Sequence, residues 1–121
     1  DACVRTGTVS VSTGTEATMT AIVWHAGNDV TSSLTFAGAY HGHSDGLLAA
    51  AVPERHQDSR LCRVTAAVAA ETIVLPYNDF EALTETFERK GEQIAAVICE
   101  SCPANMGVVP PSPALTSTFA R

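Results

Sequence analysis

The sequence predicts an α/β fold in which a mostly parallel sheet is flanked by helices. A continuous apolar run at residues 94–98 has the length of a strand and the composition of a central parallel strand covered on both faces. Two shorter β-prone runs, residues 34–36 (ending at Gly38) and 72–75, precede it. Helical patterns lie between the strands, and this alternation favours right-handed crossovers.

The first helix is expected directly after a short strand at residues 8–12. Thr13 and Glu16 have the spacing of a capping box, in which each side chain bonds a free backbone N–H of the first turn. The helix is expected to end near Gly27. Its predicted buried face consists of Ala17, Ala21, Ile22 and Trp24.

A second helix is predicted to begin after Asn78 as N-cap, with Glu81 at the capping-box position. Its basic last turn and the glycine that follows suit a helix C-terminus. The residues in question are Phe80, Leu83 and Phe87 on the apolar face, and Arg89, Lys90 and Gly91 at the end. Residues 53–63 are expected to form an exposed loop, and Pro113 to open a third helix.

Composition excludes several classes of protein. The 121 residues contain 45% hydrophobic residues, and the net charge is −6, which disfavours nucleic acid or an anionic membrane as partner. No apolar run has the roughly 20 residues of a membrane span, and residues 1–5 do not resemble a signal peptide. The four irregularly spaced cysteines favour a cytoplasmic protein with reduced thiols over a disulfide scaffold.

The first candidate site is the turn formed by Thr13, Gly14 and Thr15. A helix N-terminus presents free N–H groups and the positive end of the helix dipole, so it suits an anion such as phosphate. Most such helix starts bind only water, so the turn alone is a weak indication. Its pattern matches neither the Walker motif nor the dinucleotide glycine motif.

Two further patterns admit a metal or redox interpretation. His41 and His43, beside Asp45, could bind zinc only if a loop brought them together, and a histidine bonded to backbone is the plainer alternative. Cys99 and Cys102 form a CxxC pair. Because Cys99 ends an apolar strand, we expect it to be a small buried residue.

Glu100 is a stronger candidate. It follows the most apolar strand at the carboxyl end, where α/β proteins bind their ligands, and Asn105 lies shortly after it.

Together these segments resemble the class III aminotransferases that depend on pyridoxal 5'-phosphate (PLP), nearest the glutamate-1-semialdehyde 2,1-aminomutases. The matching segments, in the order of the family, are residues 14–19, 40–43 with Asp45, 77–79, 94–98 and 105–111. The resemblance implies that residues 1–121 are part of the large PLP-binding domain of a fold-type I enzyme, with no second domain. It also implies a small amino or oxo acid as substrate and a homodimeric full-length protein.

The resemblance assigns roles to individual residues. The phosphate of PLP would be held by Thr13, Gly14 and Thr15. Tyr40 would stack on the cofactor ring with His41 alongside, Asn105 would bond the phenolic oxygen, and Glu100 would lie near the cofactor. PLP acts as an electron sink while the protein orients it.

Several positions depart from the family pattern. Thr13 replaces a serine, Ser101 a proline and Ala104 a glycine, and residues 53–58 lack the glycine- and serine-rich loop that covers the aminomutase site. Aminomutase specificity is therefore less firmly predicted than the family.

The lysine that binds PLP as a Schiff base also has no match, since Lys90 ends a helix as a surface charge. We expect a fragment inactive on its own. The alternatives are a non-catalytic PLP- or phosphate-binding remnant and a small zinc or redox protein.

Overall fold

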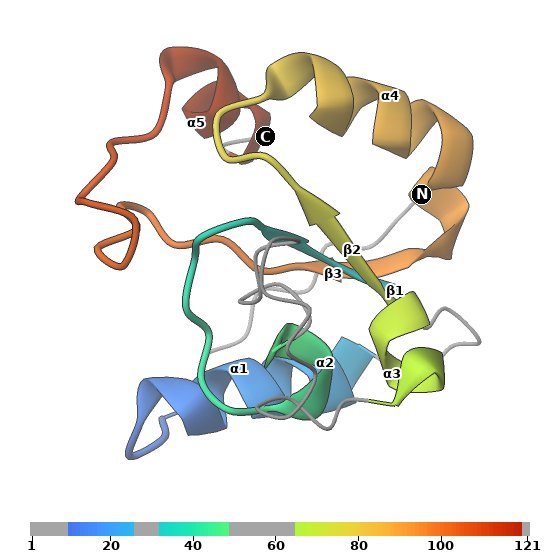
Figure 1. The fold of residues 1–121 in the computed structure, drawn as a ribbon, viewed down its shortest axis with the longest axis vertical. Coiled ribbons are helices and arrows are strands. Elements are labelled where there is room, and N and C mark those ends of the chain that lie inside the picture. Colours follow the sequence, from blue (N-terminus) through green and yellow to red (C-terminus); the bar gives the residue numbers. More distant parts are fainter. Residues whose placement is uncertain (1–9, 26–31, 49–64, 120–121) are drawn as a thin grey trace.

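The computed structural model describes residues 10–25, 32–48 and 65–119 (Figure 1). Three strands form a sheet with helices on both faces, which confirms the predicted α/β class. Helices α4 and α5 lie over one face, and α1, α2 and α3 lie over the other. The elements are α1 (Gly14–His25), β1 (Ser32–Phe36), α2 (Asp45–Leu48), α3 (Ala66–Ala70), β2 (Thr72–Leu75), α4 (Phe80–Lys90), the 3-10 turn η1 (Gly91–Gln93), β3 (Ile94–Val97) and α5 (Pro113–Phe119).

All three strands are parallel, in the order β2-β1-β3. Leu34 of β1 is paired with Ile73 on one side and Val97 on the other. The expectation that residues 94–98 form the central strand is therefore wrong within the described sheet. β1 is central and almost wholly buried, whereas the side chains of β3 are only half-buried. An apolar composition shows that a strand is buried, but it does not show which neighbours the strand has.

The core lies between the sheet and the layer of α4 and α5. Leu34 and Phe36 project from β1 onto Leu83 of α4 and Leu115 of α5, and all four are fully buried. The ring of Tyr77 meets Phe36 edge to face, with the ring centroids 5.7 Å apart. The period of two along β1 directs the alternate residues, Ser33 and Thr35, to the opposite face of the sheet.

The start of α1 confirms the predicted capping box, with one difference. The N–H of Glu16 donates to Thr13 Oγ1 at 3.2 Å, but the Glu16 carboxylate accepts from Ser12 N, at 2.9 Å. Residues 10–12 are not in a strand, so that part of the predicted strand is wrong, and residues 8 and 9 lie outside the described ranges.

The buried face predicted for α1 is only partly correct. Ala21 and Ile22 are half-buried, but Ala17 and Trp24 are exposed, Trp24 to 64%. The helix is apolar around most of its circumference, so its sequence does not single out the one side that meets the sheet.

The cap of α4 is Asp79 rather than the predicted Asn78. Asp79 Oδ1 accepts from the N–H of Ala82 at 2.9 Å. Asn78 has a φ of 68°, in the left-handed region, whereas an N-cap needs extended backbone. The helix ends in Arg89 and Lys90 as predicted. Gly91 then continues into η1 with a φ of −52°, so it does not adopt the left-handed geometry of a C-terminal glycine.

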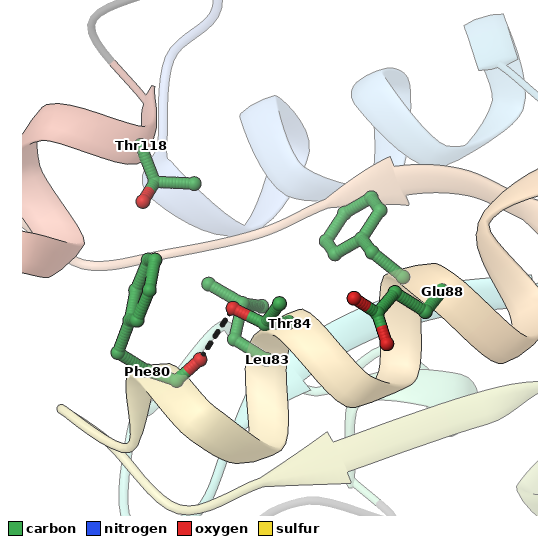
Figure 2. A pocket seen from close by; sticks show the side chains of 6 residues that line it. Phe80, Leu83, Thr84, Glu88 and Thr118 are labelled. Atoms are coloured by element: carbon green, nitrogen blue, oxygen red, sulfur yellow. Dashed lines mark hydrogen bonds between the residues drawn. The ribbon is translucent and has the colours of Figure 1, made fainter.

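An open apolar groove of about 350 Å³ runs between α4 and α5 (Figure 2). Leu83 forms its floor, while Phe80 and Phe87 are 45% and 40% exposed. Of the three residues of the predicted apolar face, only Leu83 is therefore buried in the core, while Phe80 and Phe87 line the groove.

Three elements were not predicted: the short helices α2 and α3 and the turn η1. Pro113 opens α5 as expected, and the loop predicted at residues 53–63 lies outside the described ranges. None of the helices in the described part of the chain has the length and apolar character needed to span a bilayer.

Candidate functional site

Three segments meet at the carboxyl edge of the sheet: the loop after β1, the loop after β3, and the first turn of α1 (Figure 1). Parallel strands direct all their carboxyl ends to one edge, so loops far apart in sequence become neighbours there. Every residue predicted to bind the cofactor lies in one of these three segments.

Glu100 joins the loop after β3 to the loop after β1. Its Oε1 accepts a hydrogen bond from the backbone N–H of Tyr40 at 2.8 Å. Its own carbonyl oxygen accepts from the hydroxyl of Tyr77 at 3.2 Å, so the residue is held on two sides. The Tyr40 ring is left 56% exposed.

Asn105 makes a second connection between the same loops. Its Nδ2 donates to the carbonyl of Gly38 over 3.4 Å, which is a long bond, and the other amide hydrogen has no acceptor among the described residues. Gly38 has a φ of 82°, and a Cβ there would lie 2.5 Å from Met106 Cε. The positive φ favours glycine at position 38, and a Cβ there would require the end of the Met106 side chain to move.

The first turn of α1 packs on the next residues of the β1 loop. Thr18 Oγ1 donates to the carbonyl of His41 at 2.8 Å. Gly42, with a φ of 93°, lies so close to Thr15 that a Cβ would be 2.5 Å from Thr15 Oγ1. The predicted phosphate turn and the predicted ring-stacking segment are thus in direct contact.

His41 is 6% exposed, and its Nε2 is buried without a hydrogen-bond partner among the described residues. Burial lowers the pKa of His41, and the nearby Glu100 carboxylate opposes this effect. The imidazole ring of His41 therefore stays neutral down to a lower pH than the ring of a free histidine does. His43 is exposed instead, and across the described ranges no three His, Cys, Asp or Glu side chains gather where they could hold a metal ion.

Cys99 and Cys102 are free and exposed, so the expectation of a buried Cys99 is wrong. The strand ends at Val97, and the open carboxyl edge exposes the residues beyond it. Cys99 Sγ donates to the Glu100 carbonyl at 3.3 Å. Partial burial of the sulfur, with the Glu100 carboxylate adding to it, raises the pKa of the Cys99 thiol.

Three residues that support the site were not predicted to do so: Thr18, Tyr77 and Asn78. Asn78 accepts from Ser112 N at 2.7 Å and donates to the carbonyl of Pro110 at 3.0 Å, so it ties the turn before α4 to the end of the Asn105 loop. Tyr77 and Asn78 follow β2 after Pro76, at the carboxyl edge, and that position is the signal that could have identified them.

Comparison with known proteins gives a consistent result. The model of the family described as Aminotransferase class-III matches residues 3–121. A glutamate-1-semialdehyde 2,1-aminomutase from Cutibacterium acnes is 54% identical over 117 residues, which cover 92% of this chain and 26% of that protein. The chain thus spans about a quarter of the length of this curated relative.

Solved structures agree on the fold. An ω-transaminase from Sphaerobacter thermophilus superposes with a TM-score of 0.73 and 26% identity, covering 88% of this chain and 26% of that one. A transaminase with PLP bound superposes with a TM-score of 0.67 and 29% sequence identity, covering 91% of this chain and 27% of that one. A β-phenylalanine aminotransferase from Variovorax paradoxus superposes with a TM-score of 0.66 and 28% sequence identity, covering 88% of this chain and 22% of that one.

Proposed function

Because this chain belongs to the class-III aminotransferase family, we propose that it forms part of the cofactor site of a PLP-dependent aminotransferase or aminomutase. The observation that supports this most directly is the packing of the α1 first turn on the Tyr40 loop, which Glu100 in turn holds in place. The 54% sequence identity to a glutamate-1-semialdehyde 2,1-aminomutase favours amino-group transfer on a small amino or oxo acid. A role in porphyrin biosynthesis is our proposal from the same resemblance.

The first turn of α1 fits a phosphate group. The N–H groups of Gly14 and Thr15 belong to the first turn of a helix, where intrahelical acceptors are lacking. Apart from the two chain neighbours of Gly14 and the backbone of the same helix turn, no described atom lies within 4 Å of the position that a Cβ on Gly14 would occupy, so this side of the turn has room for an anion. The Thr13 hydroxyl caps this same turn and would add polar contacts.

The neighbouring loops fit the rest of the cofactor. The exposed Tyr40 ring offers a stacking surface, and the Asn105 amide has a free hydrogen for an oxygen acceptor. The buried, unpartnered Nε2 of His41 is a polar atom that a bound group or water would satisfy. When bound, PLP would supply the electron sink of the reaction. Glu100 positions Tyr40 by holding its backbone N–H.

Lys90 lies away from this site. Helix α4 returns from the carboxyl end of β2 to the amino end of β3, so Lys90 is exposed at the opposite edge of the sheet (Figure 1). We predict that Lys90 does not bind the cofactor covalently. Borohydride reduction of the complete protein with equimolar PLP, followed by peptide mapping, should leave Lys90 unmodified, and Lys90→Arg should bind PLP equally well. A stoichiometric adduct on Lys90 would contradict this.

The phosphate role of the α1 turn can be tested with a charge at Gly14. Gly14→Asp is expected to weaken binding of PLP, measured by absorbance titration of the complete protein, by about tenfold or more relative to Gly14→Asn. The two side chains have nearly the same shape, and both suit a helix N-terminus, so the difference reports charge repulsion rather than folding. Equal affinities of the two variants would rule out a phosphate at this turn.

The homodimer predicted from the resemblance and the cytoplasmic location predicted from the thiols both remain predictions. The exposed apolar side chains of α1 are a surface that an assembly would cover, and they include Met19, Val23 and Trp24. Sedimentation of the complete protein tests the dimer.

A further inference from the structure

The loop after β3 contains two thiols that the proposed function does not use. Cys99 and Cys102 are both exposed and free. The chain bends at Ser101 and Cys102, just before Pro103. Glu100, which connects the two loops of the candidate site, lies between these cysteines in sequence. A chemical change at this pair would therefore act on the segment that holds Tyr40.

We propose that Cys99 and Cys102 are a reversible modification site, at which a small-molecule disulfide of the glutathione type closes an intramolecular disulfide. The step is balanced: the two thiols give up two protons and two electrons and form one S–S bond. The external disulfide takes up these two protons and two electrons, its S–S bond breaks, and it leaves as two thiols. A thiol reductant of the same type reverses the step.

Cys99 and Cys102 belong to the loop whose Glu100 carbonyl accepts a hydrogen bond from the Tyr77 hydroxyl. Burial raises the pKa of Tyr77, and Cys99, Cys102 and the Glu100 carboxylate each raise it further. The same hydroxyl donates to the Glu100 carbonyl, which also accepts from Cys99 Sγ. The Cys99 thiol, the phenol and this carbonyl thus form one cluster at the carboxyl edge, and the exposed Cys102 follows Cys99 by three residues across the bend at Ser101 and Cys102.

Disulfide formation changes this cluster in a definite way. The Cys99 sulfur loses its hydrogen and can no longer donate to the Glu100 carbonyl, while the new bond restrains residues 99–102. The Glu100 carboxylate and the Asn105 amide extend from this same loop to the β1 loop. Those two contacts position the predicted cofactor site, so we expect the oxidised form to bind PLP about three- to tenfold more weakly. This part of the inference rests on the proposed function.

The raised pKa of the Cys99 thiol sets the conditions for the reaction. Attack on a disulfide requires the thiolate, so the reaction is slow near neutral pH and accelerates as pH rises toward the pKa of Cys99. This pair is therefore distinct from the redox CxxC pairs at helix N-termini, where the thiol pKa is lowered.

The experiment equilibrates the complete protein with oxidised and reduced glutathione at several ratios. Peptide mapping by mass spectrometry without reduction locates the disulfide, and absorbance titration measures PLP affinity before and after reduction with dithiothreitol. Cys102→Ser removes one thiol of the pair, and Cys62→Ser is the matched control that keeps both.

The inference predicts a linked Cys99–Cys102 peptide in the unmodified and Cys62→Ser proteins, with PLP affinity that falls on oxidation and returns on reduction. In Cys102→Ser the affinity should not respond. Glutathione mixed disulfides alone, or a bond to Cys3 or Cys62 instead, would overturn the modification site. A correctly placed disulfide with unchanged PLP affinity would overturn its effect on the site. Absence of PLP binding in every form would instead contradict the proposed function, because the peptide map reports the disulfide independently.

Discussion

Replacing Gly42 with alanine is expected to reduce PLP affinity by about tenfold or more. The new Cβ would lie 2.5 Å from Thr15 Oγ1 and would sit on backbone with a φ of 93°. The left-handed backbone costs about 1–2 kcal/mol for a residue with a Cβ, and overpacking adds about 1–3 kcal/mol. The α1 turn and the β1 loop would therefore move apart, which separates the predicted phosphate site from Tyr40.

Gly107→Ala is the matched control for this substitution. Gly107 has a φ of 106°, but among the described residues no atom lies within 4 Å of the Cβ that alanine would add. It therefore incurs the backbone strain without the collision. Absorbance titration with PLP and urea unfolding of both variants separate the two effects. Equal affinities in Gly42→Ala and Gly107→Ala would show that contact between Thr15 and Gly42 does not organise the site.

Leu34→Ala is expected to lower the free energy of unfolding by about 2–5 kcal/mol, the range for a fully buried leucine that leaves a cavity. Leu34 is completely inaccessible to solvent at the centre of β1, where it packs with Leu83 and Leu115. Because native stabilities are commonly about 5–15 kcal/mol, this change removes a large share of the total. Urea denaturation followed by circular dichroism measures it.

Val74→Ala on the neighbouring strand is the control, since Val74 is 38% exposed. Val74→Ala should lower the free energy of unfolding by about 1 kcal/mol or less. If the two substitutions destabilised the protein equally, the core would not lie between β1 and the layer of α4 and α5.

The three strands of the sheet and helices α1 and α4 were predictable because they depend on local patterns, although the strand predicted at residues 8–12 does not form over residues 10–12. The apolar run at residues 94–98, the β-prone run at 72–75 and the capping box at Thr13 each describe a short segment, and each segment adopts the expected structure. Strand order is different, because it depends on contacts between distant segments. The sequence therefore indicated a buried strand at residues 94–98 without indicating that β1 lies between β2 and β3.

Competition between neighbouring polar residues explains the error at the start of α4. Asn78 and Asp79 both have side chains that can cap a helix. Asn78 is instead engaged by Pro110 and Ser112, which lie far along the chain, and so Asp79 becomes the cap. Local sequence does not contain that information.

The candidate site was predictable to a similar extent. The rule that ligands bind at the carboxyl ends of parallel strands predicted the carboxyl edge for Glu100 and Asn105, and both lie there, while their role in binding stays a prediction. The contact that joins Glu100 to Tyr40, and the support that Tyr77 gives to Glu100, follow only from the folded chain. The exposure of Cys99 likewise depends on where β3 ends relative to its neighbour.

The central place of β1 has a consequence for synthesis on the ribosome. Both partners of β1 come later in the chain, at residues 72–75 and 94–97, so β1 emerges long before either can pair with it. Sheets built from such distant pairings fold slowly, and an unpaired apolar strand is prone to aggregation while it waits. During translation Leu34 and Phe36 therefore stay exposed until residues 72–97 have emerged, although both are completely inaccessible to solvent in the folded chain.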